Sequence, residues 1–125
     1  MRVVDAGVLV NVLVGDLEPG ALGDEELVAP HLIDSEVTQV LRRLAHQGHL
    51  TEGAATAAMD GFVRLNFTRF PADWLRARMW ALRHNLSAYD ATYVALTEML
   101  SATSLLTTDS KLAGAPGIQC VVEVL

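Results

Sequence analysis

The chain has 125 residues, of which 51% are hydrophobic and 19% are charged. The composition is too apolar for a disordered chain and the length is too short for two ordinary domains, so we expect a single domain over residues 1–125. The formal net charge of −6, from 9 basic and 15 acidic residues, argues against a protein that coats nucleic acid with positive charge. It leaves open an acidic site that binds cations.

Three further features predict a cytoplasmic protein that does not contact the membrane: the single cysteine, the lack of a long apolar run and the lack of a signal-peptide pattern. The single cysteine, Cys120, cannot form an internal disulfide, and its position beside Val121 and Val122 is typical of a buried thiol in a reducing compartment. The richest apolar stretch is interrupted by Asp5 and by later polar residues, so no run approaches the roughly 18 residues of a membrane span. The same acid interrupts the pattern of a signal peptide.

The first elements are predicted by local apolar patterns. Residues 2–5 are typical of a short buried strand, and residues 8–14 of an apolar helix that follows after a two-residue turn. Residues 15–26 hold three glycines, a proline and five acids, which is typical of a surface loop. Over residues 32–47 the apolar residues follow the spacing of a one-sided amphipathic helix, which Gly48 ends. These residues are Ile33, Val37, Val40, Leu41 and Leu44.

The rest of the chain alternates helices with strands. We expect a helix over 51–65, which Thr51 can cap, and then a half-exposed strand over 66–70. The remaining elements are helices over 72–84 and 88–100, a strand over 105–108, a turn or short helix, and a last strand over 119–124. This alternation predicts parallel pairing, so the expected fold class is α/β, with a four- or five-stranded parallel sheet and helices on both faces.

Four acids are not explained by the apolar pattern. Asp5 follows Val3 and Val4 at the end of one predicted strand and Asp109 directly follows another, so both should lie at the carboxyl edge of the sheet, where open α/β folds bind their ligands. Glu36 borders the buried stripe of the 32–47 helix. Asp90 lies at the start of the 88–100 helix. The four carboxylates are therefore candidates for one site.

Each of these acids also has a simpler structural explanation. Asp5 can cap the first helix, and Asp109 can cap the turn after its strand. Ser87 and Asp90 fit the S-x-x-D variant of a capping box. These capping roles remain open beside the functional interpretation.

Glu36 can equally point to solvent or pair with Arg42 or Arg43. Asp34 competes with it for the same role from the other edge of the apolar stripe. Asp34 is more typical of a first-turn residue that complements the helix dipole.

The four acids acquire a chemical meaning as a set. Converging carboxylates repel one another unless they are protonated, paired or bound to a cation, and the chain has only one lysine. A site made of oxygen ligands selects Mg²⁺ or Mn²⁺, whereas zinc usually brings histidine or cysteine. The histidines do not form such a site, because Gly48 separates His46 from His49 and the other two are isolated. Around one or two hard cations, the natural chemistry is hydrolysis of a phosphodiester.

The order of these acids and their apolar flanks resembles the PIN-domain ribonucleases, specifically the VapC-type toxins of type II toxin–antitoxin systems. The likeness is carried, over essentially the whole chain, by the segments VVDAGVLVNVL, PHLIDSEVTQVLRRL, LSAYDATYVALTEML and LLTTDSKLA. The resemblance implies a PIN-like three-layer sandwich and a Mg²⁺-dependent endoribonuclease that hydrolyses structured RNA, with Mn²⁺ as the alternative cation. It implies that the catalytic and metal-binding acids are Asp5, Glu36, Asp90 and Asp109. It also implies a homodimer and a cognate VapB-like antitoxin, which neutralises the toxin by placing a basic residue in the acidic pocket.

One position departs from the family pattern. PIN sequences usually carry serine, threonine or asparagine two residues after the first acid, where this chain has Gly7. Asn11, one helical turn further on, is a candidate substitute, and Thr107 and Thr108 are candidates to contact water bound at the cation. Gly7 keeps an alternative function open, that of a catalytically weak or inactive PIN domain that binds RNA or its antitoxin.

Overall fold

The centre of the molecule is a sheet of five short parallel strands in the order β3-β2-β1-β4-β5. The computed structural model describes residues 1–125. The strands are β1 (Arg2–Val4), β2 (Leu27–Pro30), β3 (Thr68–Phe70), β4 (Ser104–Thr107) and β5 (Val122–Val124). In the register of the sheet, Val4 lies beside Leu106, so β4 ends one residue beyond β1.

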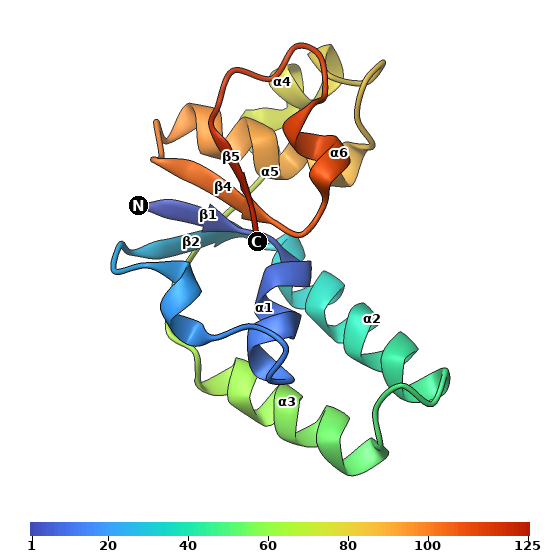
Figure 1. Cartoon of the computed structure of the whole chain (residues 1–125). Coiled ribbons are helices and arrows are strands. Elements are labelled where there is room, and N and C mark those ends of the chain that lie inside the picture. Colours follow the sequence, from blue (N-terminus) through green and yellow to red (C-terminus); the bar gives the residue numbers. More distant parts are fainter.

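Helices cover both faces of the sheet (Figure 1). One face carries α1 (Ala6–Leu13), α2 (Leu32–His46) and α3 (Glu52–Arg64), and the other carries α4 (Arg76–Ala81) and α5 (Ala88–Met99). The short α6 (Ser110–Ala113) connects β4 to β5, and 3-10 turns lie at Pro19–Leu22 and Asp73–Leu75. The α/β class and the three-layer sandwich expected from the sequence are confirmed.

The core lies between the sheet and the first helix layer on each side. Seven consecutive residues of α5, from Ala91 to Thr97, are buried, because this helix crosses β1, β2 and β4. On the opposite face α2 buries only one stripe, formed by Ile33, Val37 and Leu41, as its helical spacing predicts. This difference leaves the outer side of α2 free and holds the start of α5 firmly against the sheet.

Several elements differ from the expectation; the last strand, for example, begins at Val122 and not at residue 119. β2 was not predicted, although Val28 and Ala29 are buried and Val28 pairs with both β1 and β3. α1 begins at Ala6 and not at residue 8, because Asp5 is its N-cap. The helix expected over 72–84 is divided into a 3-10 turn and the shorter α4.

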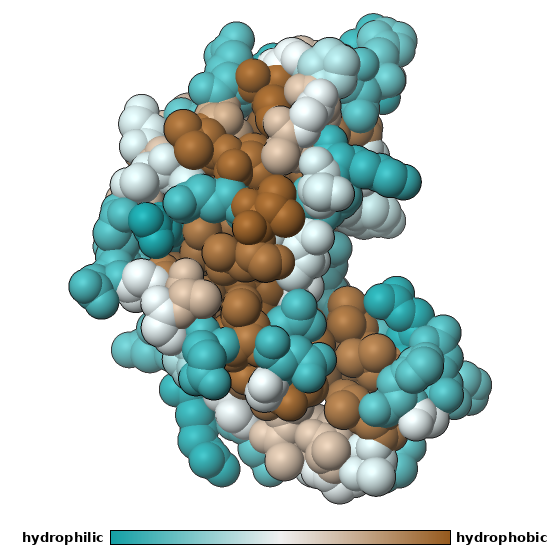
Figure 2. Space-filling view, in the orientation of Figure 1, coloured by the Kyte–Doolittle hydropathy of each residue, from teal (hydrophilic) through white to brown (hydrophobic).

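An apolar band runs over the face of the molecule that carries β5 and the C-terminus (Figure 2). The exposed large hydrophobic residues include Val121, Val124 and Leu125 at this edge of the sheet. None of the helices is both long enough and apolar enough to cross a membrane.

Candidate active site

The site begins where the strand order changes direction. The chain passes from β1 to β2 on one side and returns to β4 on the other, so the crevice between the ends of β1 and β4 is the place where α/β sheets of this kind bind ligands. The backbone N–H of Asp5 donates to the carbonyl of Leu106 over 3.1 Å, which holds the two strand ends together. Asp5 thus follows β1 directly and lies in that crevice.

The carboxylate of Asp5 is fixed through both oxygens. Its Oδ1 accepts a hydrogen bond from the Val8 backbone N–H at 3.0 Å. Asp5 therefore caps α1, which is the structural alternative expected from the sequence. Its Oδ2 accepts a short hydrogen bond from the Thr107 hydroxyl at the end of β4. Capping does not exclude a ligand role, because each carboxylate oxygen can accept more than one bond.

Three of the four predicted acids line one small cavity of about 120 Å³. Asp5 comes from the β1–α1 junction, Glu36 from α2 and Asp90 from the first turn of α5. The wall is completed by Ala6, Gly7, Val40, Tyr93 and Leu112. The elements that bring these three acids together are far apart in sequence.

The electrostatics of this cavity favour protonation or a bound cation. Burial raises the pKa of the Asp5 carboxyl, and the charge of Asp90 adds to this effect, although hydrogen bonds from Thr107 and Val8 oppose it. Burial also raises the pKa of Glu36, and the charges of Asp5 and Asp90 add to this effect, although the nearby Tyr93 hydroxyl opposes it. The pKa of Asp90 is raised by burial and then by the charge of Asp109. Mutual repulsion of this kind is relieved when a cation binds.

Sequence reasoning did not assign a site role to Tyr93. This residue lies one turn after Asp90 on α5, and its phenol and the carboxyl of Glu36 face each other in the cavity. The Oε1 of Glu36 and the hydroxyl of Tyr93 are both buried without a hydrogen-bond partner. The signal in the sequence was the spacing of three residues from Asp90, which places both side chains on one helix face.

Asp109 lies beside this cavity and not in its wall. Its backbone N–H donates to the Thr107 hydroxyl at 3.0 Å, and its Oδ1 accepts from the Lys111 N–H at 2.9 Å, so it caps α6. Because Thr107 also donates to Asp5, its hydroxyl bridges the two acids. Asp109 influences the cavity through its charge on Asp90. Asn11 is not among the residues that line the cavity.

The competing roles are resolved for the neighbouring polar residues. Asp34 forms a two-pronged ion pair with Arg69 of β3, at 2.7 and 2.8 Å, so it ties α2 to the sheet edge. Ser87 caps α5 by accepting from the Asp90 N–H at 3.1 Å. Glu36 makes no ion pair with Arg42 or Arg43, so the pairing alternative is wrong. Its Oε1 is buried, which argues against the purely solvent-facing alternative.

The donor set fits a hydrated hard cation. No three acidic, histidine or cysteine side chains are gathered closely enough to enclose a metal ion. Mg²⁺ does not need such an enclosure, because it usually retains several waters and binds through one or two carboxylates. The donors in the cavity are all oxygens, and the partnerless Oε1 of Glu36 offers a free ligand. The residues therefore fit an open Mg²⁺ site.

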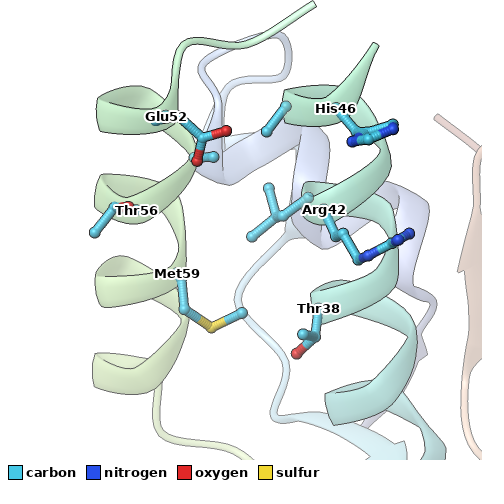
Figure 3. A pocket seen from close by; sticks show the side chains of 9 residues that line it. Thr38, Arg42, His46, Glu52, Thr56 and Met59 are labelled. Carbon is cyan, nitrogen blue, oxygen red and sulfur yellow. The ribbon is translucent and has the colours of Figure 1, made fainter. Parts of the chain in front are cut away.

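Of two other hollows on the surface, one adjoins this cavity and the other is separate from it. One, of about 460 Å³, shares Glu36 and Val40 with it and continues past Gln39, Arg43 and Tyr89. The other, of about 350 Å³, lies between α2 and α3 and is separate from the acids of the site (Figure 3). Its labelled lining consists of Thr38, Arg42 and His46 from α2 and Glu52, Thr56 and Met59 from α3.

Comparison with known proteins identifies the class to which this fold and site belong. The PIN domain family model matches residues 2–118, so the chain belongs to the PIN-domain family. Its similarity to VapC-type members extends over the full chain. It is 41% identical over 126 residues to VapC ribonuclease Mb0985 of Mycobacterium bovis, covering 100% of this chain and 98% of the relative. Ribonuclease VapC1 of Mycobacterium tuberculosis is 40% identical over 129 residues, covering 98% and 96%.

A solved structure supports the fold. The crystal structure of PAE2754 from Pyrobaculum aerophilum superposes with a TM-score of 0.69 over 90% of this chain and 82% of that chain. At 24% sequence identity this similarity concerns the fold alone. The PIN-domain and VapC-type resemblance drawn from the sequence is thus confirmed.

Proposed function

We propose that this chain is a Mg²⁺-dependent endoribonuclease toxin of a VapBC-type toxin–antitoxin pair, which hydrolyses phosphodiester bonds of structured RNA. The observation that carries the proposal is the cavity lined by Asp5, Glu36 and Asp90, in which burial and neighbouring negative charges raise the pKa values of all three carboxyls. The relatives named VapC ribonuclease support the RNA-cleaving activity. Mn²⁺ is the alternative cation, because it shares the preference for oxygen ligands.

The residues divide the work of the site. A bound Mg²⁺ supplies Lewis-acid chemistry, since it polarises a phosphodiester and activates water. Asp5, Glu36 and Asp90 would offer the carboxylates that hold the cation directly or through its waters, and Thr107 fixes the orientation of the Asp5 carboxylate. Burial raises the pKa of the Tyr93 phenol, so this group stays protonated and keeps a hydrogen to donate toward Glu36. Asp109 adds negative charge at the margin of the site.

The hollow next to the acids is the path we assign to RNA. It begins at Glu36 and is lined further out by Gln39, Arg43 and Tyr89. Arginine binds phosphate oxygens, and an exposed aromatic ring can stack on an unpaired base. Tyr89 is 62% exposed and lies one residue before Asp90, so a base stacked on its ring would bring the adjoining phosphate to the acids.

The proposed partners follow from surfaces that the fold leaves open. A cognate VapB-like antitoxin neutralises the toxin by placing a basic side chain among the acids of the cavity. The apolar band around Val121 and Val124 is the surface we assign to a second copy in a homodimer (Figure 2). The proposed location is the cytoplasm, where RNA and antitoxin are both available.

The test is cleavage of a total RNA pool by purified, antitoxin-free protein, with new ends mapped by sequencing. We expect discrete cuts with Mg²⁺, none with EDTA, and a loss of about 100-fold or more in rate for Asp90→Asn. Asp73→Asn is the matched control, because Asp73 is an exposed acid in the 3-10 turn before α4. Cleavage by Asp90→Asn at the rate of the control would overturn the assignment of the site.

The alternative function, a binding module without catalysis, is favoured by Gly7. It predicts that the folded wild-type protein binds RNA or antitoxin and produces no cuts in the same pool with Mg²⁺ present.

A further inference from the structure

Gly7 is not required by its backbone conformation. It lies in the first turn of α1, and it is not among the glycines with positive φ, which are Gly15, Gly23, Gly48 and Gly117. Glycine destabilises a helix relative to alanine, because it has more conformational freedom to lose. Some other feature of the fold must therefore explain why this position lacks a side chain.

The explanation is the space that Thr108 occupies. A Cβ atom on residue 7 would lie 2.5 Å from the Thr108 Oγ1 and 3.5 Å from its Cγ2, and the first of these distances is shorter than atoms tolerate. The same Cβ position is 3.6 Å from the Oδ1 of Asp5, and Gly7 lines the cavity of the acids. The Thr108 hydroxyl thus fills the place beside Asp5 that a side chain on residue 7 would enter.

The two threonine hydroxyls at the end of β4 differ in what they bind. Thr107 is buried, and its hydroxyl donates to Asp5 and accepts from the Asp109 N–H, so both its donor and its acceptor are satisfied within the protein. Thr108 is exposed, and its hydroxyl is not engaged in any of the side-chain hydrogen bonds of the fold. Of the two threonine hydroxyls, that of Thr108 is therefore the one left to bind a ligand at the position that a side chain on residue 7 would enter.

We propose that Thr108 is a positioning residue whose hydroxyl binds the water shell of the cation at Asp5, and that Gly7 is the space that admits it. The hydroxyl on this side of the site then comes from the end of β4, across the β1–β4 crevice, and not from α1. This inference rests on the proposed function, because it assumes that Asp5 holds a divalent cation.

The first test measures Mg²⁺ binding by calorimetry, without RNA. Thr108→Val keeps the β-branched shape and removes the hydroxyl, so we expect the dissociation constant for Mg²⁺ to rise about two- to tenfold. Thr108→Ser should bind as the wild type does, and so should the control Thr56→Val on α3. Wild-type affinity in Thr108→Val would overturn the inference.

Asp5→Asn separates this inference from the proposed function. Loss of Mg²⁺ binding in Asp5→Asn together with unchanged binding in Thr108→Val contradicts only the role of Thr108. Unchanged Mg²⁺ binding in Asp5→Asn contradicts the proposed function, and the inference fails with it.

The second test measures thermal unfolding of the metal-free protein. Gly7→Ala should lower Tm in the wild-type background, because its Cβ meets the Thr108 hydroxyl. In the Thr108→Ala background the same substitution should raise Tm, because the space is free and alanine favours the helix. The change of sign measures the coupling of the two positions. An effect of Gly7→Ala that is equal in both backgrounds would contradict the coupling.

Discussion

Asp5 combines a structural role with the role we propose in the site. It caps α1 through Val8, and Thr107 holds its second oxygen, yet burial and the charge of Asp90 still raise the pKa of its carboxyl. A carboxyl whose pKa is raised on folding stabilises the protein while it is protonated, and this contribution is lost as the pH rises through the raised pKa. The contribution of Asp5 to the stability of the metal-free protein is therefore lost on the way from acid to neutral pH.

This argument predicts a pH-dependent effect of Asp5→Asn on the metal-free protein. Asparagine is an equally good N-cap and carries no charge, so Tm of the variant should exceed the wild-type Tm by about 2–5 °C at neutral pH. The difference should shrink at acid pH, where Asp5 itself is protonated. Thermal scans in EDTA across this pH range measure it. A difference that grows toward acid pH would show that the pKa of Asp5 is lowered and not raised.

At the residue scale, the sequence predicted the acids better than their surroundings. The position of Asp5 could be predicted, because an acid directly after a buried strand must lie at the carboxyl edge of a parallel sheet. The role of Tyr93 and the contact between Gly7 and Thr108 could not be predicted, because they depend on segments that are far apart in sequence. Asn11 is absent from the lining of the cavity, so its role as a substitute for the hydroxyl missing at Gly7 stays a prediction.

At the scale of elements, α5 carries Asp90 and Tyr93, and it is anchored on its outer side by Glu98. Both Oε atoms of Glu98 accept hydrogen bonds from Arg78 of α4 at 2.9 Å, and the Gln119 N–H donates to Oε1 at 3.1 Å. Arg78 also donates to the Gly117 carbonyl at 2.7 Å. This cluster joins α4, α5 and the segment that leads to β5.

Arg78→Met should therefore destabilise the protein by about 1–3 kcal/mol, because Glu98 is largely buried and would lose its charged partner. Urea unfolding measures the effect. Arg83→Met is the control, since its guanidinium stacks on exposed Trp80 and bonds only to the Trp80 carbonyl. Equal losses in the two variants would contradict the anchoring role of the cluster.

Element types were predicted where periodicity extended over several turns, as in α2, α3 and α5. β2 was missed because it has only four residues, ends in Pro30 and is separated from α2 by His31 alone. Its burial arises from its place between β1 and β3, which no local pattern encodes. The order of the strands could not be predicted from the sequence either, because it depends on how the helices pack on the two faces of the sheet.

At the scale of the whole molecule, the fold concentrates negative charge at one edge of the sheet. The net charge of −6 makes this a costly arrangement unless a cation is present, and all acids of the cavity come from different elements around the β1–β4 crevice. The apolar band lies around the edge strand β5, whereas the cavity lies between the ends of β1 and β4. A second copy bound at the band would therefore leave the cavity of each chain intact.

The most direct measurement of the central claim is a crystal structure of the protein with Mn²⁺, located by its anomalous scattering. Our account predicts a peak within coordination distance of Asp5 and Asp90, with waters completing the shell and one of them beside the Thr108 hydroxyl. A peak at another site, or none in this cavity when Mn²⁺ is saturating, would contradict it.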